Sequence, residues 1–231
     1  MLYTLEAVRD NVRNRDGKRV FYLASGDQLT SSARDYLSRE RIEILPAEQA
    51  RVERYALLGG GYVTDKPEHM THLNASVLVS KTHPRIAFRG AMDTLEAELL
   101  LAQAVSTMPL RGQLGEVLEL ARKLIRCDVL DEPVEDKPLC GMTQQQLRER
   151  SHFPQKFYAQ PHFMPSADDG EVILHLNRVR CAARHAELMA VHAFTDRDGA
   201  ATREDILRAL NRMSSAVYIF MIEQKAKRQK E

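Results

Sequence analysis

The chain has 231 residues, and its 33 Lys and Arg residues against 32 Asp and Glu residues give a formal net charge of +1. This balance excludes the strongly basic class of proteins that bind nucleic acid or anionic membranes through bulk charge. The three cysteines, Cys127, Cys140 and Cys181, are an odd number without close spacing, which is typical of a reducing compartment. No apolar run approaches the roughly 20 residues that a membrane helix needs, and the N-terminus lacks a signal-peptide pattern. We therefore expect a soluble cytoplasmic protein.

Residues 1–58 predict a small N-terminal domain of mixed α/β structure. A short helical pattern runs over residues 3–14, residues 19–24 form a candidate strand, and a second helix is expected over residues 31–40 with Thr30 as its N-cap. A helix-turn-helix is disfavoured because the segment lacks a dense basic recognition helix. We predict that this domain docks a partner or a shell protein, and that it does not contact DNA.

Residues 59–90 form the connection to the rest of the chain. Gly59-Gly60-Gly61 can cradle a phosphate with backbone N–H groups, or it can be a plain flexible joint. His69, His72 and His83 are possible metal ligands, because imidazole binds zinc and iron. No cysteine or acidic pair stands beside them in a ligand pattern, and soft metal sites need thiolates. The sequence therefore predicts no bound transition metal.

Helical periodicity predicts a mainly α body over residues 91–231. The first two helices are expected over residues 93–107 and 113–126, where apolar residues recur every three or four positions. Thr143 is placed to cap a short helix that ends near Glu149. With two further helices toward the C-terminus, these segments predict a bundle of about five helices.

A long segment without regular periodicity follows at residues 151–170, where Pro154, Pro161 and Pro165 interrupt any helix or strand. Loops of this length inside a compact domain are often functional. The segment is rich in aromatic side chains, namely Phe153, Phe157, Tyr158 and Phe163. These side chains could cover a large flat ligand, or they could pin the loop to the bundle, and both interpretations stay open.

Residues 171–194 contain no Gly or Pro and predict one long helix. At about 100° per residue, an apolar set falls on one side and predicts the core face: Val172, Val179, Ala182, Ala186, Met189 and Ala193. Arg180, Arg184 and Glu187 fall on a different side, in line with Ile173 and Leu176. Two arginines one turn apart repel each other, so an anion should meet this side, and a guanidinium suits phosphate. The alternative is a solvated charged face.

The last helix is expected to begin after Thr202, with this hydroxyl as its cap and Asp205 in its first turn. Its apolar stripe follows the helical period: Ile206, Leu210, Met213, Val217, Phe220 and Met221. Residues 225–231 form a basic tail that complements the negative end of the helix.

Three motifs follow one another along this chain. They are Lys81-x-x-Pro84-Arg85-Ile86-x-x-x-Gly90-x-x-Asp93-x-Leu95, Arg180-x-x-x-Arg184-x-x-Glu187 and Asn211-Arg212-Met213-Ser214. In this order they resemble the signatures of the ATP:cob(I)alamin adenosyltransferases of the PduO and ethanolamine-utilisation types. The resemblance covers roughly residues 66–225, and residues 67–73 are most similar to the ethanolamine-utilisation branch.

The resemblance implies a five-helix bundle that transfers the 5′-deoxyadenosyl group of ATP to cob(I)alamin and releases triphosphate. It implies Mg²⁺ on the phosphates, a flavoprotein reductant that makes Co(I), and a homo-oligomer, either a trimer or a dimer. It further implies a part in ethanolamine or propanediol breakdown, with association to a bacterial microcompartment. Nucleic acid and membranes are not among the implied partners.

The resemblance also implies residue roles in catalysis. Arg180 and Arg184 are expected to face the phosphates or an acid of a facing subunit, and Glu187 to orient the ribose or an arginine. Asp93 is expected to pair with Arg180 across a subunit interface. Asn211 is expected to hold the adenosine.

The phosphate loop of the family, Gly-Asp-x-Gly-x-Thr, is absent from this sequence, and residues 64–72 stand in its place. Lys66, Thr71, Lys81 and Arg85 offer two ammonium groups, a hydroxyl and a guanidinium for the phosphates. They are therefore our candidate nucleotide-binding residues.

Phe163 precedes Arg180 at about the spacing of the aromatic residue that covers the lower face of cobalt in the family. His162 is the competing possibility, as a direct axial ligand, although a bound imidazole would oppose reduction of the cobalt. The family's Asp after Asn-Arg-Leu-Ser is Ser215 here. This departure and the missing phosphate loop keep two alternatives open: a non-catalytic cobalamin or nucleotide-binding regulator, and a microcompartment adaptor.

Overall fold

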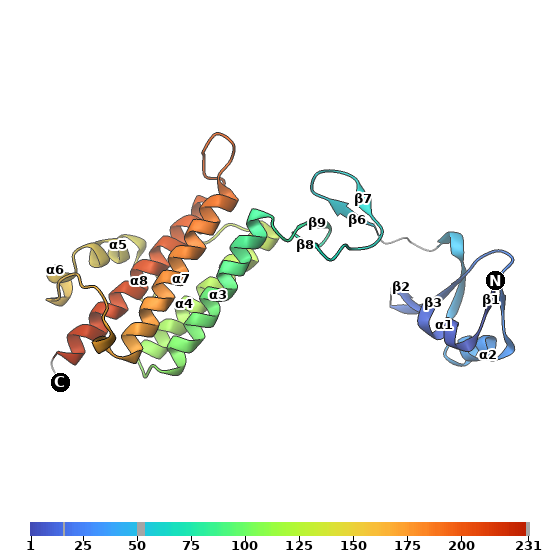
Figure 1. Cartoon of the computed structure of the whole chain (residues 1–231), viewed down its shortest axis with the longest axis horizontal. Coiled ribbons are helices and arrows are strands. Elements are labelled where there is room, and N and C mark those ends of the chain that lie inside the picture. Colours follow the sequence, from blue (N-terminus) through green and yellow to red (C-terminus); the bar gives the residue numbers. More distant parts are fainter. Residues whose placement is uncertain (16, 50–53, 230–231) are drawn as a thin grey trace. The chain divides into compact units, whose positions relative to one another are not determined.

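The computed structural model describes residues 1–15, 17–49 and 54–229. The chain forms two compact units, the first made by Met1–Tyr55 with Tyr62–Asp65 and the second by Ala56–Gly61 with the chain from Lys66 onward. In Figure 1 the strands and helices near the N-terminus are blue, and the long helices run from green to red. No helix in the described ranges is both long and apolar enough to cross a membrane.

The first unit has the expected mixed α/β structure. Its sheet has the order β2 (Arg13–Arg15), β3 (Lys18–Leu23), β5 (Glu43–Pro46), with β3 antiparallel to β2 and parallel to β5. The remaining elements are β1 (Leu2–Tyr3), which pairs with β4 (Gln28–Leu29), α1 (Leu5–Asn11), α2 (Ser31–Arg39) and the 3-10 turn η1 (Ala47–Gln49).

A small apolar core holds this unit together, and it consists of Val8, Phe21, Ala33, Leu37 and Ile42. The predicted cap of the second helix is confirmed, because the Oγ1 atom of Thr30 accepts a hydrogen bond from the Ala33 N–H at 3.3 Å. Such a cap satisfies one of the backbone donors that every helix leaves unpaired at its start.

A second set of short strands precedes the helices: β6 (Tyr55–Leu57), β7 (Tyr62–Val63), β8 (Met70–His72) and β9 (Val77–Ser80). Strand β9 pairs parallel with β6 and antiparallel with β8. The triple glycine forms the turn after β6, where the N–H of Leu57 donates to the carbonyl of Gly61 at 3.1 Å. Gly60 and Gly61 have φ of 95° and 80°, a region that side chains disfavour.

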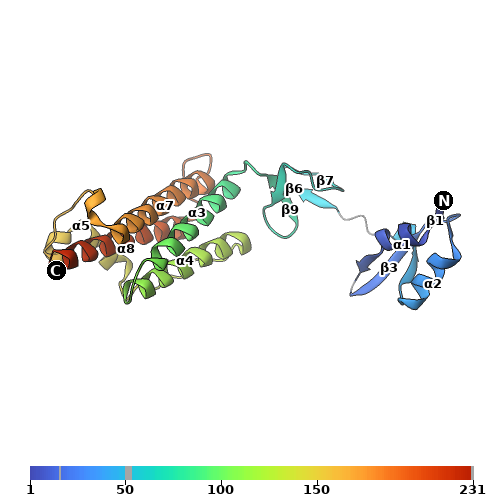
Figure 2. The same ribbon diagram turned by 60° about the horizontal axis from the view of Figure 1, so that its bottom comes forward.

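The helices of the second unit form the predicted bundle. They are α3 (Pro84–Ala104), α4 (Leu110–Leu130), α5 (Gln144–His152), the short α6 (Pro154–Tyr158), α7 (Glu171–Phe194) and α8 (Glu204–Arg228), with the 3-10 turn η2 (Ala167–Asp169) before α7. Helix α7 packs on both α3 and α8, while α4 packs on α3 and α5 on α8 (Figures 1 and 2).

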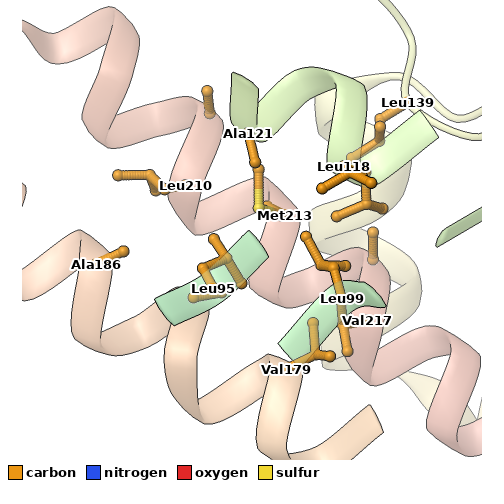
Figure 3. Packing of buried hydrophobic residues seen from close by; sticks show 14 of the residues in the cluster. Leu95, Leu99, Leu118, Ala121, Leu139, Val179, Ala186, Leu210, Met213 and Val217 are labelled. Atoms are coloured by element: carbon orange, nitrogen blue, oxygen red, sulfur yellow. The ribbon is translucent and has the colours of Figure 1, made fainter. Parts of the chain in front are cut away.

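The predicted core face of α7 is wrong in part, because the bundle core buries a different set of its residues (Figure 3). The buried residues are Ile173, Leu176, Val179, Ala183, Ala186, Ala190 and Phe194. Of the predicted set, only Val179 and Ala186 are buried, and the other four lie half-buried at the margin. Ile173 and Leu176, which we had grouped with the arginines, belong to the core. The error arises because α7 has neighbours on two sides, so its buried arc is centred between them and apolar residues also occupy both margins.

The predicted start of α3 and the predicted N-cap of α8 are wrong for local reasons. Helix α3 begins at Pro84 and not at Asp93, because proline is well suited to the first turn and His83 Nδ1 accepts the Arg85 N–H at 3.2 Å as an N-cap. Thr202 does not cap α8, since its Oγ1 donates to the Phe194 carbonyl at 3.0 Å and closes the loop between α7 and α8. The predicted cap at Thr143 is confirmed, with a full capping box to Gln146.

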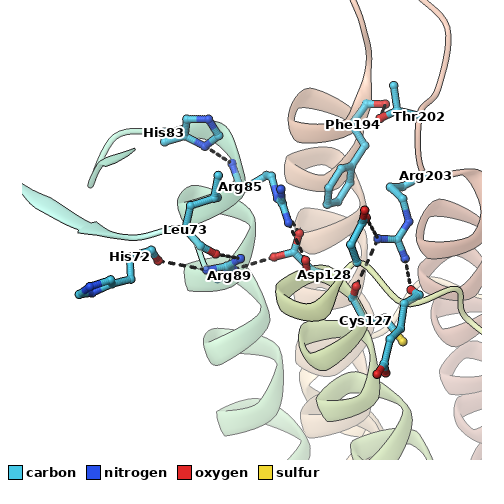
Figure 4. Close-up of polar contacts among 12 residues, drawn as sticks. His72, Leu73, His83, Arg85, Arg89, Cys127, Asp128, Phe194, Thr202 and Arg203 are labelled. Carbon is cyan, nitrogen blue, oxygen red and sulfur yellow. Dashed lines mark hydrogen bonds and ion pairs between the residues drawn. The ribbon is translucent and has the colours of Figure 1, made fainter. Parts of the chain in front are cut away.

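A buried carboxylate, Asp128, fixes the end of α4 to the start of α3 (Figure 4). Its Oδ1 accepts from Arg85 Nε at 2.7 Å and its Oδ2 from Arg89 Nε at 2.6 Å. Arg89 also donates to the Leu73 carbonyl at 2.7 Å, and Arg85 to the Asp128 carbonyl at 2.5 Å. These bonds join α3, α4 and the residue after β8 in one network, and they place cations at the negative end of α4.

A second clamp acts on the same end of α4. Arg203 donates to the carbonyls of Cys127 at 3.3 Å and Glu132 at 2.8 Å, and it pairs with Asp205 at 2.9 Å. Burial alone would raise the pKa of Asp205, but hydrogen bonds from Arg203 and from the Val134 and Ile206 N–H groups outweigh it and lower the pKa to about 2. The ionised carboxylate therefore stabilises the fold.

We expect Asp128→Asn to lower the free energy of unfolding by about 3 kcal/mol, because one partner of a buried ion pair is removed. Glu96→Gln is the matched control, since Glu96 and Arg122 also join α3 to α4, at 2.9 Å, but Arg122 is 57% exposed. The control should cost about 1 kcal/mol or less. Equal losses in urea denaturation would contradict the special weight given to Asp128.

Asp205→Asn should destabilise the protein at neutral pH by an amount that depends on acidity. The folded pKa of about 2 lies below the ordinary value of 3.8, so the stabilisation is present in full above about pH 4 and is lost as the pH falls toward 2. The difference in unfolding free energy between wild type and variant should shrink over this range. Glu204→Gln, in the same helical turn but exposed, should show no such trend. A pH-independent difference for Asp205→Asn would contradict the assignment.

Candidate functional site

Three pockets meet where α7 and α8 face the end of α5 and the loop after α6. The first, of about 290 Å³, is lined by Ser151, His152, His162, Arg180, Arg184, Ser214, Ser215 and Tyr218. The second, of about 320 Å³, is lined by His162, Phe163, Met164, Pro165, Arg180, Tyr218 and Met221. The third, of about 490 Å³, lies under Phe153, Pro154 and Pro161, and His162 borders all three.

Two of the three arginines of α7, Arg180 and Arg184, line the first pocket. Arg180 is half-buried, and its Nε and Nη2 donate to the neutral amide oxygen of Asn177 at 3.2 and 3.0 Å. Arg184 is exposed, and among the described residues it has neither a hydrogen bond nor an ion pair. No carboxylate in the described chain pairs with either guanidinium. This pocket therefore holds two positive charges that an anionic ligand could neutralise.

Glu187 and Asn211 meet one helical turn further along the α7–α8 contact. Asn211 Nδ2 donates to Glu187 Oε1 at 2.8 Å, and Asn211 Oδ1 accepts a hydrogen bond from Arg212. Burial, and then the charge of nearby Arg148, lowers the pKa of Arg212. The sequence assigned separate tasks to Glu187 and Asn211, whereas the structure joins them in one hydrogen-bonded unit.

Phe163 lies half-buried in the loop and packs against the bundle core. Its ring stacks on Tyr218 with centroids 6.5 Å apart, and Lys225 Nζ lies 5.6 Å from the ring centroid. Lys225 in turn pairs with the buried Asp169, which anchors the loop to the end of α8. The loop is therefore pinned by aromatic packing, and at the same time Phe163 borders a pocket with Arg180. The interpretation that the aromatic residues pin the loop is therefore confirmed for Phe163, and the interpretation that they cover a ligand stays a prediction.

The candidate nucleotide residues lie elsewhere in the second unit. Lys66 and Lys81 are exposed, Thr71 is half-buried on β8, and Arg85 is bound to Asp128. Phe88, one turn beyond Arg85, packs edge-on against Phe194 at the end of α7, at 5.4 Å. Arg180 lies about 21 Å along the helix from that end, at 1.5 Å per residue. Within a single chain, these candidate nucleotide residues are therefore far from the pocket that Arg180 and Arg184 line.

Asp93 is exposed on α3 and has no ion-pair partner within residues 1–15, 17–49 and 54–229. His83 caps α3, and burial followed by the charge of Arg85 lowers its pKa. Across those same ranges, no group of three His, Cys, Asp or Glu side chains is placed to hold a metal ion.

Sequence reasoning missed Asp128, Arg89 and Tyr218. Arg85 and Arg89 stand one turn apart, a spacing that calls for an acid, but nothing in the sequence marks Asp128 as that acid. Tyr218 was within reach, because Asn211, Ser215 and Tyr218 follow one another at spacings of four and three and so share a helix face.

Comparison with known proteins agrees with the family that the three sequence motifs resemble. The family model described as cobalamin adenosyltransferase matches residues 61–224. Corrinoid adenosyltransferase EutT of Salmonella typhimurium is 34% identical over 165 residues, covering 71% of this chain and 62% of that protein. EutT of Escherichia coli K12 is 34% identical over 160 residues, covering 69% and 60%. The chain thus spans about three fifths of the length of these relatives.

Two solved structures share the fold. A variant of the PduO-type ATP:corrinoid adenosyltransferase from Lactobacillus reuteri, complexed with ATP, has a TM-score of 0.51 at 18% identity and covers 70% of this chain and 92% of that chain. Another variant of the Lactobacillus reuteri PduO-type enzyme, complexed with cobalamin and ATP, has a TM-score of 0.51 at 16% identity and covers 80% and 92%. Their helical-bundle fold is the one predicted here from the sequence.

Proposed function

We propose that this chain, which belongs to the cobalamin adenosyltransferase family, transfers the 5′-deoxyadenosyl group of ATP to cob(I)alamin and releases triphosphate. The observation that carries the proposal is the pair of arginines, Arg180 and Arg184, that line one pocket without a carboxylate partner among the described residues. Cobalt in the Co(I) state is itself the nucleophile, so the protein need not supply one. Its tasks are to align the 5′-carbon with the cobalt and to stabilise the departing triphosphate.

The pockets suggest how these tasks are divided. Arg180 and Arg184 hold phosphate oxygens, and Mg²⁺, when bound with ATP, would supply further positive charge to the phosphates. The Glu187–Asn211 unit, at a hydrogen bond of 2.8 Å, orients the adenosine. Phe163 covers the lower face of the cobalt and excludes water from it. No protein-bound transition metal takes part.

Lys66, Thr71, Lys81 and Arg85 remain our candidates for the other end of the polyphosphate. Within a single chain these four residues are far from the arginine pocket. We therefore propose that a second copy of the chain places its own four residues beside that pocket. Asp93 would then pair with Arg180 of the neighbouring copy. Exposed apolar residues on α3 and α7 support such an interface, among them Leu101, Leu174 and Leu188. Two arginines already share Asp128, so Arg85 retains positive charge for a phosphate.

We further propose a cytoplasmic enzyme that serves ethanolamine or propanediol breakdown, receives electrons from a flavoprotein and associates with a microcompartment. Residues 1–58 are the candidate docking domain. The regulator alternative gains from Ser215, whose hydroxyl donates to the Asn211 carbonyl at 3.1 Å and so replaces the family's carboxylate only weakly. A measurement of turnover distinguishes such a regulator from an enzyme.

The direct test is formation of adenosylcobalamin from ATP, Mg²⁺ and chemically reduced cobalamin. Arg184→Gln should raise the KM for ATP about 10- to 100-fold, since a charge-assisted hydrogen bond contributes roughly 1.5–3 kcal/mol. Arg178→Gln is the control, because Arg178 lies on the same helix but pairs with Glu98 at 2.5 Å. Binding of both substrates without product would favour the regulator, and no binding at all would contradict the proposal.

Asp93→Ala should loosen the oligomer and weaken ATP binding together, because breaking one side of a buried pair costs roughly 3–5 kcal/mol. The mass in solution and the KM for ATP measure the two effects. Glu96→Gln, one turn along α3, should change neither. A variant with unchanged mass and unchanged KM would show that Asp93 does not pair with Arg180.

Phe163→Ala should admit water or the nucleotide tail to the cobalt, and so lower turnover when a flavoprotein supplies the electrons. With cobalamin reduced chemically beforehand, the loss should be much smaller, because the reduction step is bypassed. Bound cob(II)alamin should be four-coordinate in wild type and five-coordinate in the variant. Phe157→Ala is the control, since this ring lies under Arg150 and Lys156 and outside the second pocket. If Phe157→Ala and not Phe163→Ala changes the spectrum, the assignment moves to Phe157.

A further inference from the structure

Both ring nitrogens of His162 are engaged in hydrogen bonds. Its Nε2 lies 3.2 Å from the His152 carbonyl oxygen, and its Nδ1 lies 2.9 Å from the Tyr218 hydroxyl. A carbonyl oxygen can only accept, so Nε2 must carry the hydrogen. In the neutral ring Nδ1 then presents a lone pair, and the Tyr218 hydroxyl donates to it. The His152 carbonyl thus selects the tautomer, and the Tyr218 hydroxyl occupies the one nitrogen that could bind a metal.

The geometry around this contact leaves the imidazole little freedom. The two rings stack with centroids 5.8 Å apart and an interplanar angle of 8°. Tyr218 stands on α8 and packs, partly buried, against the bundle core, which restricts the position of its hydroxyl. His162 is exposed in the loop, and its only hydrogen bonds to the described chain are those to Tyr218 and His152.

His162 is placed where the lone pair of its Nδ1 could bind the cobalt and oppose the reaction. It borders all three pockets and stands next to Phe163. Neutral imidazole binds first-row transition metals well, and cobalt(II) is among them. An imidazole on the lower face would hold the cobalt five-coordinate and oppose its reduction to Co(I), which is the step that Phe163 is proposed to assist.

We propose that Tyr218 is a positioning residue that keeps the His162 imidazole from ligating the cobalt, by donating its hydroxyl hydrogen to Nδ1. This inference rests on the proposed function, because it requires a corrinoid in these pockets. It assigns Tyr218 a task distinct from packing: the ring supports Phe163, and the hydroxyl blocks a competing ligand. Removing only the Tyr218 hydroxyl should therefore free His162 Nδ1 to bind cobalt while the ring of residue 218 still stacks on Phe163.

The test uses the full chain with ATP and cob(II)inamide, a corrinoid without a nucleotide base, so that an axial nitrogen can come only from the protein. Electron paramagnetic resonance of the wild-type complex should show no nitrogen coupling on the axial lines. Tyr218→Phe should split these lines into triplets, and histidine labelled with nitrogen-15 should turn the triplets into doublets. The double variant Tyr218→Phe with His162→Gln should lose the splitting, and His162→Gln alone should resemble wild type.

Two further measurements separate this inference from simple pinning of the loop. Nitrogen chemical shifts of His162 in the ligand-free protein should report the Nε2–H tautomer in both proteins, because the His152 carbonyl still holds that hydrogen. In Tyr218→Phe the Nδ1 shift should move to that of an acceptor nitrogen without a hydrogen bond. Tyr158→Phe, at the end of α6, should leave the His162 shifts unchanged. Turnover of Tyr218→Phe should fall several-fold with a flavoprotein reductant and recover with chemically reduced cobalamin.

The outcomes are distinct. If the wild-type protein changes the cob(II)inamide signal but Tyr218→Phe shows no nitrogen coupling, the inference is wrong and the proposed function stands. Nitrogen coupling in the wild type would also overturn it, since His162 would then already be a ligand. If no protein changes the signal of free cob(II)inamide, the corrinoid does not occupy these pockets, and both this inference and the proposed function fail.

Discussion

A single buried carboxylate sets the geometry of the second unit. Asp128 has no exposed surface and accepts from two arginines of α3, one of which also holds the Leu73 carbonyl. Isolated charges are costly to bury, so this carboxylate is tolerated only because both of its oxygens are paired. The pairing fixes the end of α4, the start of α3 and the chain after β8 in one arrangement. The segment that carries Thr71 and Lys81 is therefore attached to the bundle at a defined place.

Two groups of arginines in the second unit differ in their partners. Arg85, Arg89 and Arg203 each bind a carboxylate and a backbone carbonyl, and they contribute to the fold. Arg180 binds only a neutral amide, and Arg184 is exposed in the same pocket. The residue type is the same in both groups, and the difference lies in whether the chain supplies an anion. That difference is what marks the α7–α8 pocket as a place for a ligand with negative charge.

Local signals in the sequence were enough for most of the helices and too weak for the contacts between them. The limits of α7 agree with the prediction, because no Gly or Pro interrupts the segment and Gly170 precedes it. The caps at Thr30 and Thr143 were predictable from hydroxyl residues at the right offset. The core face of α7 was misjudged because it depends on where α3 and α8 lie. The partner of Arg85 depends on a fold that brings α4 beside α3, and residue spacing carries no information about that.

Helix α7 connects the two ends of the second unit, with Phe194 against Phe88 at one end and Arg180 beside the loop at the other. An α-helix is a stiff rod whose length and rotation are coupled, at about 1.5 Å and 100° per residue. It therefore fixes the distance between the pocket arginines, Arg180 and Arg184, and the strands before α3. One inserted residue would turn Arg180 and Arg184 out of the pocket while the other end kept its place. Changes in length should thus be absorbed by the loop between Asp131 and Thr143 or by the turn at residues 195–203, and evolution should hold the span of α7 constant.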